Sequence, residues 1–145
     1  MQLAEAMDPR FRALVLVGAF GGLRIGGLAG LQLGDFDPLR NLIRVRRTAA
    51  DVQGRVIVGP PKTSKSIHTV TLPRSITKRL VEHLTDSGAS DPGEWIFPAP
   101  EGGPIRRTAW VRRYWKPALA TAGLPTDLGT HVLRRSQVAL LIAPR

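Results

Sequence analysis

Residues 21–31 read GGLRIGGLAGL and place paired glycines between two apolar segments. In the upstream segment, apolar residues recur at helical spacing after the pair Asp8-Pro9, which is typical of a helix start. The first two glycines predict that this helix ends there. A second short helix is predicted from about Arg24 to Leu31. Arg24 therefore stands at the start of a helix, two residues after the paired glycines. The glycines lack the strand-then-helix setting of a dinucleotide-binding loop.

Beyond residue 40, apolar and polar residues alternate, which is typical of half-buried strands. The first predicted strand covers residues 43–46. The second covers 55–58, after a turn near 51–54, and the third covers 68–72. Short strands joined by tight turns predict a small three-stranded antiparallel sheet. Helical spacing returns at 75–84, 108–122 and 131–143, so the predicted class is α+β and mostly helical.

The length of 145 residues suits one domain, so residues 1–145 are expected to form a single domain. The sequence contains no cysteine, which excludes a disulfide scaffold, a thiolate zinc site and a cysteine nucleophile. No apolar run approaches the roughly 20 residues that cross a bilayer, and the first ten residues do not resemble a secretory signal. We therefore expect a cytoplasmic protein without a membrane partner.

Basic residues outnumber acidic ones by 21 to 11, which gives a net charge of +10. The excess is concentrated in two blocks. Residues 37–80 hold ten basic and two acidic residues, and residues 105–145 hold eight basic and one acidic. The block between them, residues 81–104, has five acidic residues and no basic one. Two basic blocks favour a polyanionic partner, most often nucleic acid, over a merely basic surface.

Several cationic residues occupy special positions, although each by itself is most often a solvated charge. Arg24 follows the glycine break, and Lys62 lies between two predicted strands. His131 and Arg134 are spaced i and i+3, so they project from one face of the last helix. The three histidines are not at metal-ligand spacing with carboxylates, and no metal site is expected. Phosphoryl transfer is a reaction class that cationic side chains serve without a metal.

Five short segments follow one another in a characteristic order: GLRIG at 22–26, PKT at 61–63, TVTLP at 69–73, WIFP at 95–98 and THVLR at 130–134. In type, order and spacing they resemble the catalytic domain of the tyrosine recombinases, the phage integrase family. The likeness covers roughly residues 11–142. It implies double-stranded DNA as the partner, neither a cofactor nor a small-molecule substrate, and site-specific DNA recombination as the function. Whether copies of the chain assemble on DNA stays open.

The resemblance also implies roles for four residues. Arg24 and Arg134 match the two arginines that clamp the scissile phosphate. Lys62 matches the lysine that protonates the departing 5′ oxygen, and His131 matches an acid/base and orienting group. In the family, a tyrosine attacks the phosphate and forms a 3′-phosphotyrosyl link, which strand exchange then reverses.

The sequence departs from the family pattern in several places. Gly27 stands where the family usually has an acidic residue, and Val132 and Arg135 replace the Asp and second His of the histidine–arginine box. The family nucleophile lies beyond that box, and the family has a further DNA-clamping domain before the catalytic one. We therefore expect a domain shortened at both ends, a prophage remnant or a fragment, that is inactive alone.

Tyr114 is the only tyrosine and precedes His131. With Trp110 and Ala118 it forms a stripe at helical spacing, which predicts a packing role.

Three functions remain in competition. The first is an integrase-like domain for DNA breakage and rejoining, and the second is a DNA-binding remnant or regulator without chemistry. The third, a reader of single-stranded RNA, is disfavoured because residues 41–73 contain no Phe, Tyr or Trp for base stacking.

Overall fold

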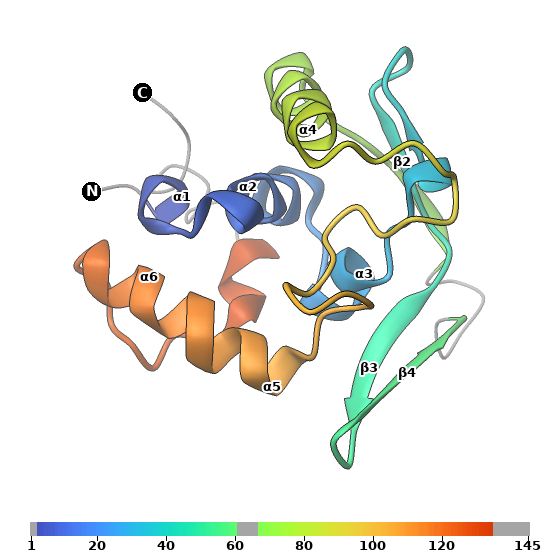
Figure 1. The fold of residues 1–145 in the computed structure, drawn as a ribbon. Helices are drawn as coiled ribbons and strands as arrows, with labels where there is room; N and C mark the ends of the chain where they lie inside the picture. Colours follow the sequence, from blue (N-terminus) through green and yellow to red (C-terminus); the bar gives the residue numbers. More distant parts are fainter. Residues whose placement is uncertain (1–2, 61–66, 135–145) are drawn as a thin grey trace.

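The computed structural model describes residues 3–60 and 67–134. Its helices and strands confirm the predicted α+β class (Figure 1). In chain order the elements are α1 Leu3–Ala6, the 3₁₀ turn η1 Pro9–Phe11, α2 Arg12–Gly21, α3 Ile25–Ala29, η2 Leu33–Asp35, β1 Phe36–Asp37, β2 Leu42–Val45, β3 Thr48–Val52, β4 Arg55–Gly59, β5 His68–Thr71, α4 Arg74–Ser87, α5 Arg107–Trp110, the π-helical turn η4 Val111–Trp115, α6 Lys116–Thr121 and the 3₁₀ turn η5 Thr130–Arg134. No helix in the described ranges is both long and apolar enough to cross a membrane.

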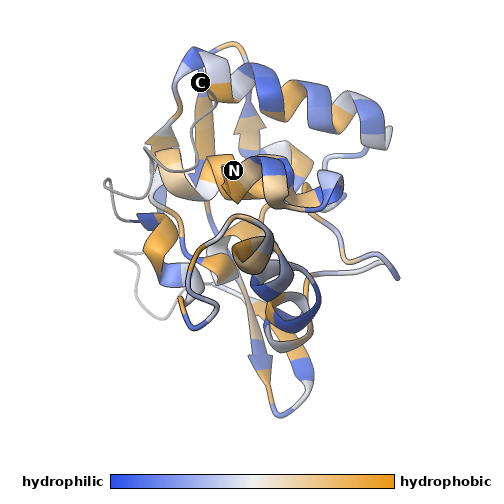
Figure 2. Cartoon of the chain, turned by 90° about the vertical axis from the view of Figure 1, so that its left-hand side faces the viewer, coloured by the Kyte–Doolittle hydropathy of each residue, from blue (hydrophilic) through white to orange (hydrophobic). Residues whose placement is uncertain are grey.

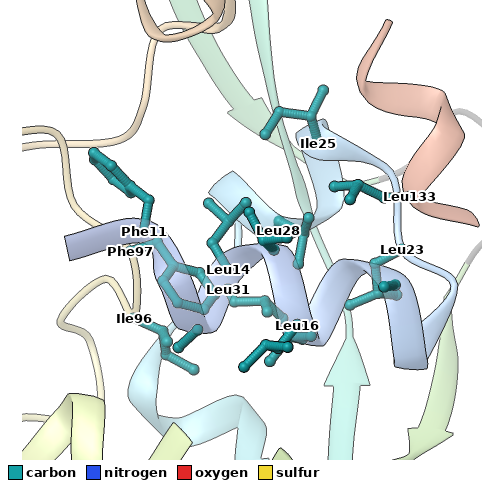
Figure 3. Packing of buried hydrophobic residues seen from close by; sticks show 14 of the residues in the cluster. Phe11, Leu14, Leu16, Leu23, Ile25, Leu28, Leu31, Ile96, Phe97 and Leu133 are labelled. Atoms are coloured by element: carbon teal, nitrogen blue, oxygen red, sulfur yellow. The ribbon is translucent and has the colours of Figure 1, made fainter. Parts of the chain in front are cut away.

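Helix α2 forms the centre of the hydrophobic core. Seven of its ten residues, Ala13 to Ala19, are buried, so the helix is apolar on all sides. The core continues from α2 into α3, η5 and the segment around Phe97, which converge on it (Figure 3). Helix α4 covers α2 from outside and buries one apolar stripe, while its outer face is hydrophilic (Figure 2).

The predicted glycine break lies at the end of α2. Gly22 adopts φ +68°, a left-handed conformation that favours glycine, and its amide donates to the carbonyl of Gly18. The amide of Leu23 donates to the same carbonyl at 3.1 Å. The chain therefore turns sharply and begins α3 at Ile25, close to the predicted start.

The strands form two sheets, which differs from the single sheet predicted. One sheet has the order β1-β2-β5, and the other is the β3–β4 hairpin. The predicted strand at 55–58 therefore pairs with residues 48–52, which the prediction had left outside the strands. The reason is the turn: Gln53 and Gly54 have φ +51° and +78°, as in a two-residue hairpin turn, so both flanking segments must be extended.

One helical segment runs through α5, η4 and α6, and its π turn explains how two tryptophans five positions apart are both buried. Residues five apart lie close to one face in a π turn. The rings of Trp110 and Trp115 stack with centroids 6.1 Å apart, and Trp115 Nε1 donates to the carbonyl of Leu128 at 2.8 Å. This bond holds the loop that precedes η5 against the helix.

A buried carboxylate fixes the passage from β2 to β3. The Asp35 side chain is 3% exposed; it pairs with Arg47, and with Arg46 at 3.5 Å, and accepts from the Gln32 amide at 2.9 Å. Arg47 also donates to the carbonyl of Gly30 at 3.2 Å. A Cβ at Gly30 would lie 2.7 Å from the Arg47 carbonyl oxygen, so this approach requires glycine.

We expect Asp35→Asn to lower the free energy of unfolding by about 2–3 kcal/mol. This is less than the roughly 3–5 kcal/mol lost when a fully buried pair loses one partner, because Arg46 is half exposed. Urea denaturation measures this change in the free energy of unfolding. The control is Asp37→Asn, whose pair with exposed Arg40 spans 3.9 Å and should contribute about 0–1 kcal/mol. Equal effects of the two substitutions would contradict the structural role assigned to Asp35.

Candidate functional site

A pocket of about 500 Å³ opens between the start of α3, strand β3, the start of α5 and turn η5. Three of the four residues that the sequence analysis selected line it: Arg24, His131 and Arg134. The fourth, Lys62, lies outside the described residues. The structure thus brings together side chains that are more than 100 positions apart in the chain, while their chemical roles stay predictions.

Arg24 reaches the pocket because the chain is extended at this residue, with φ −81° and ψ 158°, just before α3. The first helical positions that follow are Ile25, which is buried, and two glycines that line the pocket. A Cβ at Gly26 would lie 3.4 Å from the carbonyl oxygen of Ala49, so α3 and β3 approach closely behind Arg24. Within the described part of the chain, the Arg24 side chain forms neither a hydrogen bond nor an ion pair.

His131 and Arg134 line the pocket from η5, and Val132 and Leu133 between them are buried. The turn is a 3₁₀ helix, in which side chains at i and i+3 are eclipsed, so the predicted shared face holds more strictly than in an α-helix. Figure 3 shows Leu133 extending from η5 toward the core beside Leu28. The sequence predicted an α-helix over 131–143, but its first residues form a 3₁₀ turn instead. The remainder, 135–143, lies outside the described residues.

The approach of η5 to the core depends on a small residue in α2. A Cβ at Gly18 would lie 3.0 Å from Leu28 Cδ1 and 3.1 Å from Leu133 Cδ1. Thr130, predicted as a helix cap, is instead the buried first residue of the turn. A glycine also precedes it, and a Cβ at Gly129 would lie 2.7 Å from His131 Nδ1. The imidazole therefore packs against the Gly129 backbone.

One hydrogen bond ties the two ends of the pocket together. Arg134 Nε donates to the carbonyl oxygen of Gly22 at 3.0 Å, across 112 positions of sequence. Because Gly22 stands two residues before Arg24, this bond fixes the Arg134 guanidinium next to the segment that carries Arg24. It occupies Nε only, which leaves the two terminal NH₂ groups as donors.

Two charged residues of the pocket were missed by the sequence analysis. Arg107 enters from the first residue of α5, and Asp51 enters from β3. Asp51 is the one carboxylate among the residues that line the pocket, and its Oδ2 lies 3.5 Å from the Thr108 amide nitrogen. No sequence signal distinguished Arg107 from its neighbour Arg106, because both belong to one basic run.

The charge balance of the pocket favours an anionic ligand. Three guanidinium groups and one imidazole face one carboxylate. Guanidinium groups present planar forks of N–H donors that match the oxygens of phosphate and carboxylate. The described residues include no cluster of three or more metal-ligating side chains, here or elsewhere.

Tyr114 lies away from this pocket. Its ring packs against Phe11 with centroids 4.8 Å apart, and the Arg10 guanidinium lies 5.6 Å from the ring centroid. It borders a separate, much smaller hollow with Arg113 and Trp110. The predicted packing role is consistent with these contacts, although the side chain is half-buried rather than fully enclosed.

Known proteins resemble this chain in sequence and in fold. The family model described as "Phage integrase family" matches residues 1–143. The integrases of Mycobacterium phages D29 and L5 are 31% and 29% identical over 136 residues, which cover 91% of this chain and 36% of each relative. The chain thus spans little more than a third of their length. A solved structure of the Tn1549 transposon integrase, in complex with transposon right end DNA, superposes with a TM-score of 0.75 at 16% identity, covering 88% of this chain and 44% of that one.

Proposed function

The chain belongs to the phage integrase family, and from this membership we propose that its basic pocket holds a backbone phosphate of double-stranded DNA during site-specific recombination. One observation carries the proposal: Arg24, His131 and Arg134, from opposite ends of the chain, line a single pocket of about 500 Å³. The two basic blocks of the sequence support the same partner, because a duplex attracts Lys and Arg along its whole backbone.

Each clamping arginine has a defined task in this proposal. A phosphodiester carries one negative charge on two non-bridging oxygens, and that charge increases when a nucleophile adds to phosphorus. Arg24 and Arg134 donate to these oxygens and stabilise the crowded, more highly charged transition state. Arg134 is already oriented by its bond to Gly22, so less conformational freedom is lost on binding.

The remaining groups handle protons. In the family reaction a tyrosine oxygen forms a bond to phosphorus as the bond to the 5′ oxygen breaks, so the tyrosine loses a proton and the 5′ oxygen gains one. We assign the first transfer to His131 and the second to Lys62. The energy of the phosphodiester is conserved in the covalent link, so the reaction requires no cofactor. The cytoplasm, where DNA is accessible in a bacterial host, is the proposed location.

The second candidate, a DNA-binding module without chemistry, applies to the 145-residue chain by itself. The observation that favours it is the position of Tyr114 outside the pocket. A nucleophile must stand in line with the departing oxygen, and a ring packed on Phe11 does not meet this condition. We therefore propose that the isolated chain binds DNA and leaves it uncut.

The isolated chain should bind a fluorescein-labelled DNA duplex with a Kd on the order of 10⁻⁴ to 10⁻⁶ M at physiological salt. The affinity should fall steeply with NaCl, because each neutralised phosphate releases counterions. Arg24→Ala should weaken binding and reduce the log–log salt slope, by at most the roughly 0.9 of one lost phosphate contact, because Arg134 still contacts the same phosphate. Fluorescence anisotropy at several NaCl concentrations measures both quantities.

The matched control is Arg79→Ala, which removes the same charge from α4, outside the pocket. It should leave the slope nearly unchanged. Equal losses for the two variants would mean that the pocket is not the phosphate site. Binding that does not respond to salt would exclude the proposed partner.

Tyr114→Phe should leave urea stability nearly unchanged, because the phenyl ring keeps its packing on Phe11. Neither the wild-type chain nor this variant should form a covalent complex with a nicked suicide DNA substrate on a denaturing gel. A covalent band given by the wild-type chain and lost in Tyr114→Phe would show that Tyr114 is a nucleophile after all.

A further inference from the structure

Arg107 places a third guanidinium in the pocket, from a wall that neither of the recognised arginine segments supplies. Arg24 belongs to the start of α3 and Arg134 to η5, whereas Arg107 is the first residue of α5. All three line the same cavity (Figure 1 shows α5 beside α3 and the hairpin). The three cations thus approach one space from three separate elements.

The Arg107 side chain is available to a ligand. It is exposed, and within the described part of the chain it takes part in no hydrogen bond or ion pair. Asp51, the carboxylate of the same pocket, is not within ion-pair distance of it among the described contacts; its closest interaction is the one with the Thr108 amide. Among residues 3–60 and 67–134, no acceptor therefore competes for the five N–H donors of the Arg107 side chain.

The size of the pocket permits such a third contact. A volume of about 500 Å³ lies within the roughly 300–1,000 Å³ of pockets that enclose whole small ligands, so it exceeds the need of a single phosphate group. Each non-bridging phosphate oxygen can accept more than one hydrogen bond, so contacts to Arg24 and Arg134 leave acceptor capacity for a third guanidinium. Without an anion, three guanidinium groups around one cavity repel each other, and a bound phosphate relieves this repulsion.

We propose that Arg107 contacts the same DNA phosphate as Arg24 and Arg134, and that it is a further binding residue of the site. This inference rests on the proposed function, because it takes its ligand from there. It adds a residue that lies in neither of the two motifs carrying the pocket arginines, and it assigns the start of α5 to the DNA-contacting surface.

The adjacent Arg106 provides a close control. It too is exposed, and it is the residue directly before α5, but it borders the small hollow near Tyr114 instead of the pocket. Arg106→Ala and Arg107→Ala therefore remove the same charge at neighbouring exposed positions. Circular dichroism first establishes that both variants fold.

Duplex binding by both variants is then measured by anisotropy over a range of NaCl concentrations. Arg107→Ala should weaken binding more than Arg106→Ala does. Because Arg24 and Arg134 still neutralise the shared phosphate, Arg107→Ala should lower the log–log salt slope by less than the roughly 0.9 of a whole lost phosphate contact, while Arg106→Ala should leave the slope near that of the wild type. A double variant with Arg24→Ala tests whether the two arginines share a phosphate. Its loss of affinity should differ from the product of the two single losses by at least about twofold, because residues acting on one ligand group are not additive.

The outcomes separate this inference from the proposed function. If wild-type binding is salt-dependent and weakened by Arg24→Ala but unaffected by Arg107→Ala, the pocket binds phosphate and the role of Arg107 is refuted. Equal losses for Arg106→Ala and Arg107→Ala, or additive losses in the double variant, also refute it. Wild-type binding without salt dependence refutes the proposed function itself.

Discussion

The contacts of Arg47 determine where the pocket can form. Its guanidinium joins the buried Asp35 to the carbonyl that ends α3, and its own carbonyl lies against Gly30. These contacts fix the chain at the point where it leaves β2. Strand β3 begins one residue later, so the direction of the hairpin across α3 is set here. Since α3 and β3 form two walls of the pocket, a site that contains neither Arg47 nor Asp35 depends on their pairing.

The protein treats its many arginines in two distinct ways. Arg46 and Arg47 are paired with a buried carboxylate and serve the fold. Arg24 and Arg107 line the pocket. Neither forms an ion pair with an acidic residue in the described part of the chain. Arg134 combines both uses, because Nε is bonded to the backbone while its terminal groups stay available. The net charge of the chain does not show which arginines serve the fold. The positions of the acidic residues show it, because they decide which arginines are paired.

Local rules predicted much of the fold, whereas the motif residues of the site were identified through the family resemblance. The glycine break at Gly22 and the shared face of His131 and Arg134 follow from backbone conformation and residue spacing, which a short stretch of sequence contains. The partner of β4 was not predictable from alternation, because the decisive feature is the turn at residues 53–54, where a glutamine adopts positive φ. Arg107 was missed for another reason. It lines the same pocket as Arg24 only because α5 lies close to the start of α3, and no sequence pattern links these two elements.

The bond between Arg134 and Gly22 has a consequence for the order of events during synthesis. It closes a loop of 112 residues, and contacts of such long sequence separation form late because the chain entropy of loop closure must be overcome first. Arg24 is synthesised early, whereas Arg134 follows 110 positions later in the chain. A nascent chain therefore cannot assemble all walls of the pocket until residue 134 has been translated. A chain interrupted before η5 keeps Arg24 and Arg107 but lacks His131 and Arg134, so its pocket is missing one wall.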